Sequence, residues 1–184
     1  AGHHVAAFEH EQEFWPELGG GRHQRLVVIT HEYRGQPAVE DARARLAMGW
    51  LALGVAALAA SGILAVLLVL SRTRGLAKLF PVADFFHAAL VAHVDLSVLV
   101  WFLAFAGMLW SLNSTPRFLP AGWAALGLAA LGAAAMTIAP FAGGSPIMAN
   151  YVPVLEAPAF LGGLALFGLG IALLVARGLF ASPL

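Results

Sequence analysis

Residues 47–70 read AMGWLALGVAALAASGILAVLLVL, a stretch without a charged side chain. A helix of roughly 20 apolar residues crosses the ~30 Å hydrocarbon core of a bilayer, so this stretch predicts a transmembrane helix. Three further apolar runs follow, at about 85–112, 120–141 and 157–180. The sequence therefore predicts an all-α integral membrane protein with four transmembrane helices that form part of a larger helical bundle.

The composition agrees with this prediction and excludes several functions. Hydrophobic residues make up 60% of the 184-residue chain and charged residues 11%, with a mean hydropathy of +0.83, whereas soluble domains carry about a quarter charged residues. Ten Lys and Arg balance ten Asp and Glu, so the chain has no basic surplus for nucleic-acid binding. Cysteine is absent, which excludes disulfides, thiolate zinc sites, iron–sulfur clusters and cysteine nucleophiles.

Lys and Arg near the ends of the spans predict the orientation, because short cytoplasmic loops are enriched in them. The N-terminal flank, the second loop and the C-terminal end carry seven of these residues, against three in the first loop and none in the third. We therefore expect a protein of the bacterial inner membrane with both termini in the cytoplasm and the third loop, 143–153, outside. The seven are Arg22, Arg25, Arg34, Arg43, Arg45, Arg117 and Arg177, and the first loop has Arg72, Arg74 and Lys78.

Residues 1–45 form a polar, histidine-rich extension, and residues 46–184 form the transmembrane region. The extension holds five of the seven histidines, and imidazole and carboxylate groups are suitable metal ligands. Their spacing is irregular and matches no helical pair or zinc motif, so a solvated tail or a partner-docking arm is the favoured interpretation. Residues 24–30 (QRLVVIT) predict one short strand. The candidate metal ligands are His3, His4, His10, His23, His31, Glu9, Glu11 and Glu13.

The second span carries ionisable residues, which are costly inside a membrane and are therefore functional candidates. Asp84 lies at its start, and His87, His93 and Asp95 follow. On a regular helix Asp84 and Asp95 lie within about 20° of each other, and His93 lies on the opposite face from Asp95. We therefore expect one carboxylate face and one histidine face. Asp84, Asp95 and Glu156, which precedes the fourth span, are candidates for proton handling or for structural polar contacts.

His93 is the candidate cofactor ligand. It lies about 13 Å along the span, and its small or aliphatic neighbours provide the low relief that a flat macrocycle beside a helix needs. From chemistry alone, a haem ligand, a core histidine bonded to a neighbouring helix, a proton relay and a quinone site all remain open. The neighbours are Ala89, Leu90, Leu96 and Ser97.

The segment 86–102, FHAALVAHVDLSVLVWF, resembles the second transmembrane helix of the catalytic subunit I of haem-copper oxidases, in the branch that includes nitric oxide reductase-like enzymes. The resemblance covers about residues 40–180, with lesser support from 42–47 (ARARLA) and 150–155 (NYVPVL). It implies that His93 is an axial ligand of the iron of a low-spin haem, and that His87 is not a ligand.

No histidine follows His93, so the second axial ligand, the high-spin haem and the copper of such an enzyme need another segment or chain. The resemblance implies a component of a membrane respiratory haem-copper oxidoreductase, without catalytic residues of its own. It would pass electrons from a cytochrome or quinol donor towards an oxygen- or nitric oxide-reducing site built by other helices.

Two alternatives to this function remain. One is a non-catalytic structural subunit of a respiratory or other membrane complex, and the other is a small transporter or proton-relay protein that uses Asp84, Asp95 and Glu156. Gly and Ala on several helix faces favour close helix packing in lipid. We therefore expect the partners to be membrane lipid and other transmembrane subunits, or the remainder of the catalytic subunit, and not nucleic acid.

Overall fold

A computed structural model of the protein describes residues 37–80, 82, 84–148 and 153–181. The histidine-rich extension before residue 37, with its candidate metal ligands and its predicted strand, lies outside these residues. One compact unit, Asp41–Leu184, contains the bundle. The helices are α2 (Pro37–Arg72), η1 (Ala77–Leu79), α3 (Phe85–Val94), the π-helix η2 (Asp95–Val100), α4 (Trp101–Asn113), α5 (Leu119–Ala142) and α6 (Pro158–Phe180), and the strands are β1 (Ser145–Ile147) and β2 (Val154–Glu156).

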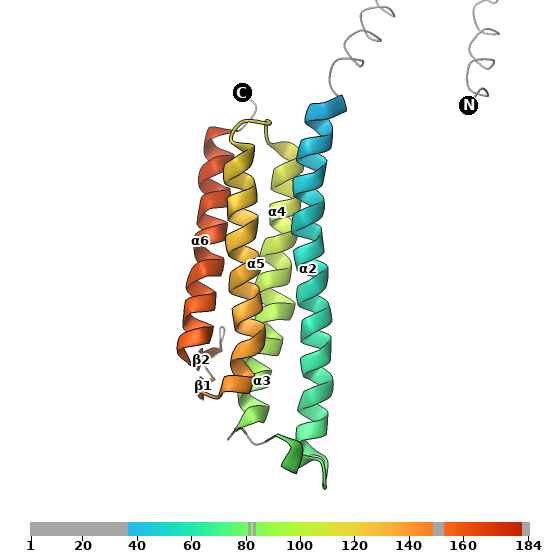
Figure 1. Ribbon diagram of the computed structural model, residues 1–184, viewed down its shortest axis with the longest axis vertical. Helices are drawn as coiled ribbons and strands as arrows, with labels where there is room; N and C mark the ends of the chain where they lie inside the picture. Colours follow the sequence, from blue (N-terminus) through green and yellow to red (C-terminus); the bar gives the residue numbers. More distant parts are fainter. Residues whose placement is uncertain (1–36, 81, 83, 149–152, 182–184) are drawn as a thin grey trace, which may run out of the picture. The chain divides into compact units, whose positions relative to one another are not determined.

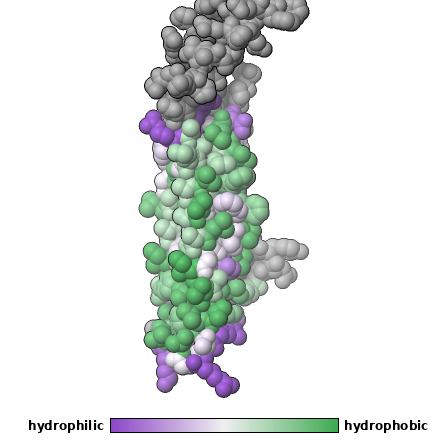
Figure 2. Space-filling view, turned by 90° about the vertical axis from the view of Figure 1, so that its right-hand side faces the viewer, coloured by the Kyte–Doolittle hydropathy of each residue, from purple (hydrophilic) through white to green (hydrophobic). Residues whose placement is uncertain are grey.

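Among the described residues, four helical segments are long and apolar enough to cross a membrane: Ala42–Arg72, Phe85–Asn113, Leu119–Ala142 and Pro158–Phe180. The prediction of an all-α integral membrane protein with four transmembrane helices is thereby confirmed. The segments run side by side along the long axis of the bundle (Figure 1). Figure 2 shows one face of it, with hydrophobic side chains over the middle and hydrophilic ones near both ends, as a bilayer requires.

Helix α2 begins at Pro37, ten residues before the apolar run, because the stretch before this run is rich in strong helix formers and proline is favoured in a first helical turn. The third loop contains a short antiparallel hairpin in which Ser145 pairs with Glu156. Gly143 and Gly144 turn the chain from α5 into this hairpin at φ values of 85° and 151°, which glycine adopts without strain.

Helices α5 and α6 pack with their backbones in close contact. A Cβ added at Gly132 of α5 would lie 2.5 Å from the carbonyl oxygen of Gly163 and 2.5 Å from the nitrogen of Phe167 in α6. One at Gly170 of α6 would lie 2.7 Å from the carbonyl oxygen of Ala125. Small residues permit this close approach. Because the hydrophobic effect does not drive helices together within lipid, van der Waals contact between the two backbones stabilises their association instead.

Helix α2 packs on the rest of the bundle mainly through side chains. The indole of Trp50 is fully buried, and a Cβ at Gly107 of α4 would lie 2.7 Å from it. Gly54 of α2 lies against the ring of Trp101, at the start of α4. Thus a glycine of α4 packs against a tryptophan of α2, and a glycine of α2 packs against a tryptophan of α4.

Two arginines hold the loop between α4 and α5. Arg43 of α2 donates to the carbonyl of Ser114 over 3.1 Å. Arg177 of α6, only 3% exposed, donates to the carbonyls of Phe118 and Thr115 over 3.2 and 3.1 Å. The bonds to Ser114 and Thr115 satisfy carbonyls just after the end of α4, and the Phe118 carbonyl also accepts from the Gly122 N–H in the first turn of α5.

Candidate functional site

His93 is tied to Ser61 of α2 across the interface between α2 and α3. Its Nδ1 lies 2.9 Å from the backbone carbonyl oxygen of Ser61 and 2.8 Å from the hydroxyl oxygen of the same residue. The Ser61 hydroxyl in turn donates to the carbonyl of His93 over 3.0 Å. A carbonyl oxygen can only accept, and the serine proton is used, so Nδ1 carries the ring proton and donates it.

This arrangement fixes the tautomer of a neutral His93. With the proton on Nδ1, the lone pair lies on Nε2, and among the described residues no hydrogen bond to Nε2 is present. Histidines that bind metals usually donate their other N–H to a carbonyl or carboxylate in this way, which orients the ring. The residue is half-buried. The site therefore suits one axial bond to a haem iron.

The backbone changes geometry directly after this histidine. The carbonyl of His93 accepts a second hydroxyl, that of Ser97, over 2.8 Å, and the π-helix runs from Asp95 to Val100. Short π-helical turns inside α-helices often mark functional sites. Hydroxyl groups commonly satisfy the carbonyls that such turns release within a membrane.

Asp95 faces the protein interior, as the sequence predicts for a carboxyl group within a span. Its residue is 3% exposed, and its Oδ2 has no hydrogen-bond partner within the described part of the chain. A buried polar atom without a partner is costly.

The expected carboxylate face, by contrast, is wrong. Asp84 precedes α3 in a left-handed conformation, with φ of 57°, so the regular helical spacing that placed it beside Asp95 does not apply. It is exposed and bonds to Nδ1 of His87, whose ring packs edge-on against Phe86. Glu156 is exposed on β2. Of the three candidate carboxylates, only Asp95 is buried.

Ser61 is the residue that sequence reasoning missed. It is the only side chain with a hydroxyl in residues 47–70, which is a usable signal, but nothing in the sequence pairs it with a residue 32 positions away. Among the described residues, no group of three or more His, Cys, Asp or Glu could hold a metal ion. A haem iron, unlike such a metal ion, could be held through a single histidine of this chain, and His93 is the candidate for that role.

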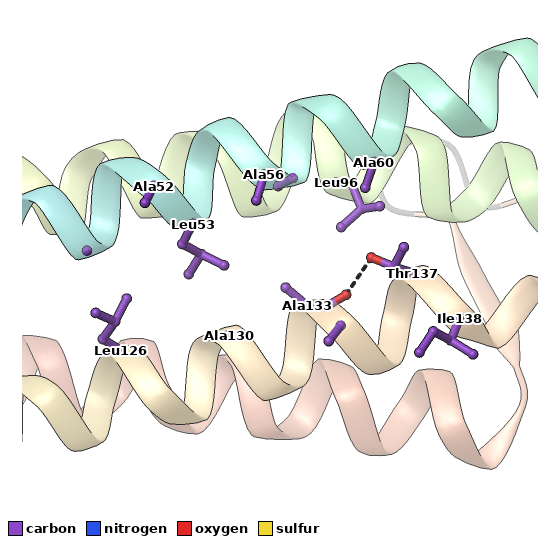
Figure 3. A pocket seen from close by; sticks show the side chains of 13 residues that line it. Ala52, Leu53, Ala56, Ala60, Leu96, Leu126, Ala130, Ala133, Thr137 and Ile138 are labelled. Atoms are coloured by element: carbon purple, nitrogen blue, oxygen red, sulfur yellow. Dashed lines mark hydrogen bonds between the residues drawn. The ribbon is translucent and has the colours of Figure 1, made fainter.

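A groove of about 550 Å³ separates α2 from α5. Figure 3 shows Leu53 and Ala56 of α2 opposite Leu126 and Thr137 of α5 across it. The Thr137 hydroxyl is used within its own helix, where it donates to the carbonyl of Ala133 over 2.8 Å. The groove therefore offers an apolar surface, and its one hydroxyl group is already used in a hydrogen bond. Its lining residues are Gly49, Ala52, Leu53, Ala56, Ala57, Ala60, Leu96, Leu126, Ala130, Ala133, Ala134, Thr137 and Ile138.

No family model and no solved structure matches the chain. It is similar to an uncharacterized protein of Aquifex aeolicus (strain VF5), with 37% identity over 129 residues, covering 67% of this chain and 31% of that protein. It is also similar to an uncharacterized protein of Rickettsia prowazekii (strain Madrid E), with 30% identity over 152 residues, covering 70% of this chain and 30% of that protein. The chain thus spans less than a third of the length of each of these relatives.

Proposed function

We propose that this chain is the haem-holding part of a membrane respiratory oxidoreductase of the haem-copper type, and that His93 binds the iron of a low-spin haem through Nε2. A haem bound there would carry single electrons between a cytochrome or quinol donor and a site that reduces oxygen or nitric oxide. The chain's own residues bind and orient this group. The second axial ligand, the high-spin haem and the copper belong to helices outside the chain.

One observation supports this proposal most: the donation from Nδ1 of His93 to the Ser61 carbonyl over 2.9 Å. A histidine that served only as a polar contact between two helices would need no particular orientation of its other nitrogen. Here the tie directs the Nε2 lone pair away from α2 and leaves it without a partner in the described part. The ligand strength of the imidazole also rises when its N–H is donated.

The orientation in the membrane belongs to the same proposal. Arg43, Arg117 and Arg177 lie around the loop between α4 and α5, whereas Arg72 ends α2. We place the former end in the cytoplasm of a bacterial inner membrane, by the excess of Lys and Arg on that side. His93 then lies in the half of the bilayer away from the cytoplasm, nearer to the Arg72 end of the helices.

The test is a matched pair of histidine variants in the assembly purified through a tag on this chain. His93→Ala should abolish the low-spin absorption bands and remove one haem per assembly in a pyridine haemochrome assay. His87→Ala should keep most of both, because His87 bonds to Asp84 and points about 120° away from His93. Equal loss in the two variants, or normal haem in His93→Ala, would refute the proposal.

A structural membrane subunit is the second candidate, favoured by bare glycines on the bundle surface. Gly62, Gly127, Gly162 and Gly168 lie on three helices, and within the described structure no atom would meet a Cβ placed on any of them within 4 Å. Such positions allow other helices to approach closely. A haem-free assembly whose subunit composition is unchanged by His93→Ala would support this candidate over the first.

A further inference from the structure

Arg72, the last residue of α2, is a cation held in position at the end of the α2–α3 interface. Its Cζ lies 3.7 Å from the centre of the Phe86 ring in α3. It is exposed, and within the described residues no carboxylate lies at ion-pair distance from it. Asp84 shares a cavity of about 220 Å³ with it but bonds to His87. The guanidinium thus has a fixed place and no anionic partner in the described part of the chain.

Arg72 and His93 lie along one line between the same two helices. Phe86 precedes His93 by seven residues, which places it about 20° away on the helix and about 10 Å along the axis. On α2, Arg72 follows Ser61 by eleven residues, again about 20° away. The Ser61–His93 tie and the Arg72–Phe86 contact are therefore the inner and outer ends of one α2–α3 seam.

The groove towards α5 occupies one flank of this seam, and its lining includes Leu96 but not His93. On the flank away from α5, helical spacing places Gly62 and Ala65 of α2 beside Leu90 of α3. None of the described atoms lies within 4 Å of a Cβ added at Gly62, so this flank has low relief beside His93.

We propose that Arg72 binds the carboxylates of the haem held by His93; this inference rests on the proposed function. Haem is an apolar macrocycle with two carboxylates on one edge, and carboxylates within a bilayer need a cation or water. The planar guanidinium matches a carboxylate through two parallel N–H donors. Stacking on Phe86 orients that plane. The carboxylate edge then faces the membrane surface at the Arg72 end, and the apolar edge faces the bilayer centre.

The test compares Arg72→Gln with Arg74→Gln in the purified assembly. Arg74 lies two residues further along the same exposed loop, and its substitution removes the same charge from the chain. Arg72→Gln should lose haem to excess apomyoglobin about tenfold faster, since a bidentate charge-assisted pair is lost. It should also lower the midpoint potential and shift the carboxylate bending band in the resonance Raman spectrum. Arg74→Gln should leave all three readouts at the wild-type values.

Arg72→Lys keeps the charge without the planar donor pair and should lie between the wild type and Arg72→Gln. Tryptophan fluorescence and gel filtration check that each variant folds and assembles. If His93→Ala loses haem but Arg72→Gln matches Arg74→Gln in all three readouts, the role of Arg72 in binding the haem carboxylates is refuted, and His93 as the iron ligand is not. If the wild type holds no haem that depends on His93, the proposed function and this inference are refuted together.

Discussion

Gly132 provides the sharpest prediction about what holds the bundle together. A Cβ at this position would lie 2.5 Å from two backbone atoms of α6, the Gly163 oxygen and the Phe167 nitrogen. Backbone cannot rotate away as a side chain can, so in Gly132→Ala the two helices must separate locally by about 1 Å to regain van der Waals distance. A gap of that size forfeits a quarter to a half of each affected contact. We expect a loss of about 2–3 kcal/mol in the free energy of unfolding.

The matched control is Gly127→Ala, in the same helix and five residues earlier. No described atom lies within 4 Å of a Cβ there, and alanine is the better helix former by about 1 kcal/mol. The control should therefore be as stable as the wild type or slightly more stable. Unfolding of the purified assembly by increasing SDS in mixed micelles, followed by tryptophan circular dichroism, measures both. Equal stability of the two variants would show that α5 and α6 do not pack as described.

Three further predictions concern polar groups. Ser61→Ala removes the hydroxyl but keeps the backbone carbonyl that accepts from His93. It should therefore cost about 1 kcal/mol of stability and retain the haem. Complete haem loss would show that the hydroxyl, and not the carbonyl, orients His93. Arg177→Ala should destabilise the protein by about 2 kcal/mol in the same unfolding assay, since charged hydrogen bonds to two loop carbonyls are lost, while the exposed Arg117→Ala should change it by less than about 0.5 kcal/mol. Asp95→Asn should leave turnover unchanged and weaken assembly with partner subunits, because Asp95 is buried at the start of the π-helix and its substitution perturbs the packing of that helix; normal assembly with lost proton uptake would instead assign a proton relay.

The membrane spans could be predicted from the sequence because length and hydropathy alone determine them. The glycines show where such reasoning ends. Gly122, Gly127 and Gly132 recur every five residues, which predicts only that they spread around the helix. Which of them meets a backbone depends on the axial position of α6, and that is set by packing along the whole interface. Gly132 is buried against α6 and Gly127 is exposed.

The candidate site, too, could be predicted from the sequence only in part. His93 could be found because an ionisable group deep in a span is unusual, but its tie to Ser61 depends on the axial alignment of two antiparallel helices. The placement of Asp84 failed for a local reason: this residue is left-handed, with φ of 57°, and interrupts the helical repeat. Aspartate adopts this conformation more often than most residues, but too seldom for the sequence to predict it here. The π-helix after His93 likewise changes the rotation per residue, so angles calculated across it from an α-helix do not hold.

The three contacts of α2 described above have a mechanical consequence. Arg43 near its start donates to the loop after α4, Ser61 in its middle bonds to His93, and Arg72 at its end stacks on Phe86. Towards α5, Leu46 and Gly49 pack against Gly122 and Leu126, and the rest of that side faces the apolar groove. A tilt of α2 that keeps these contacts would widen or narrow the groove. Changes in bilayer thickness or lateral pressure would be absorbed on the α5 side, and the distance between His93 and Arg72 would stay constant while the membrane around them changes.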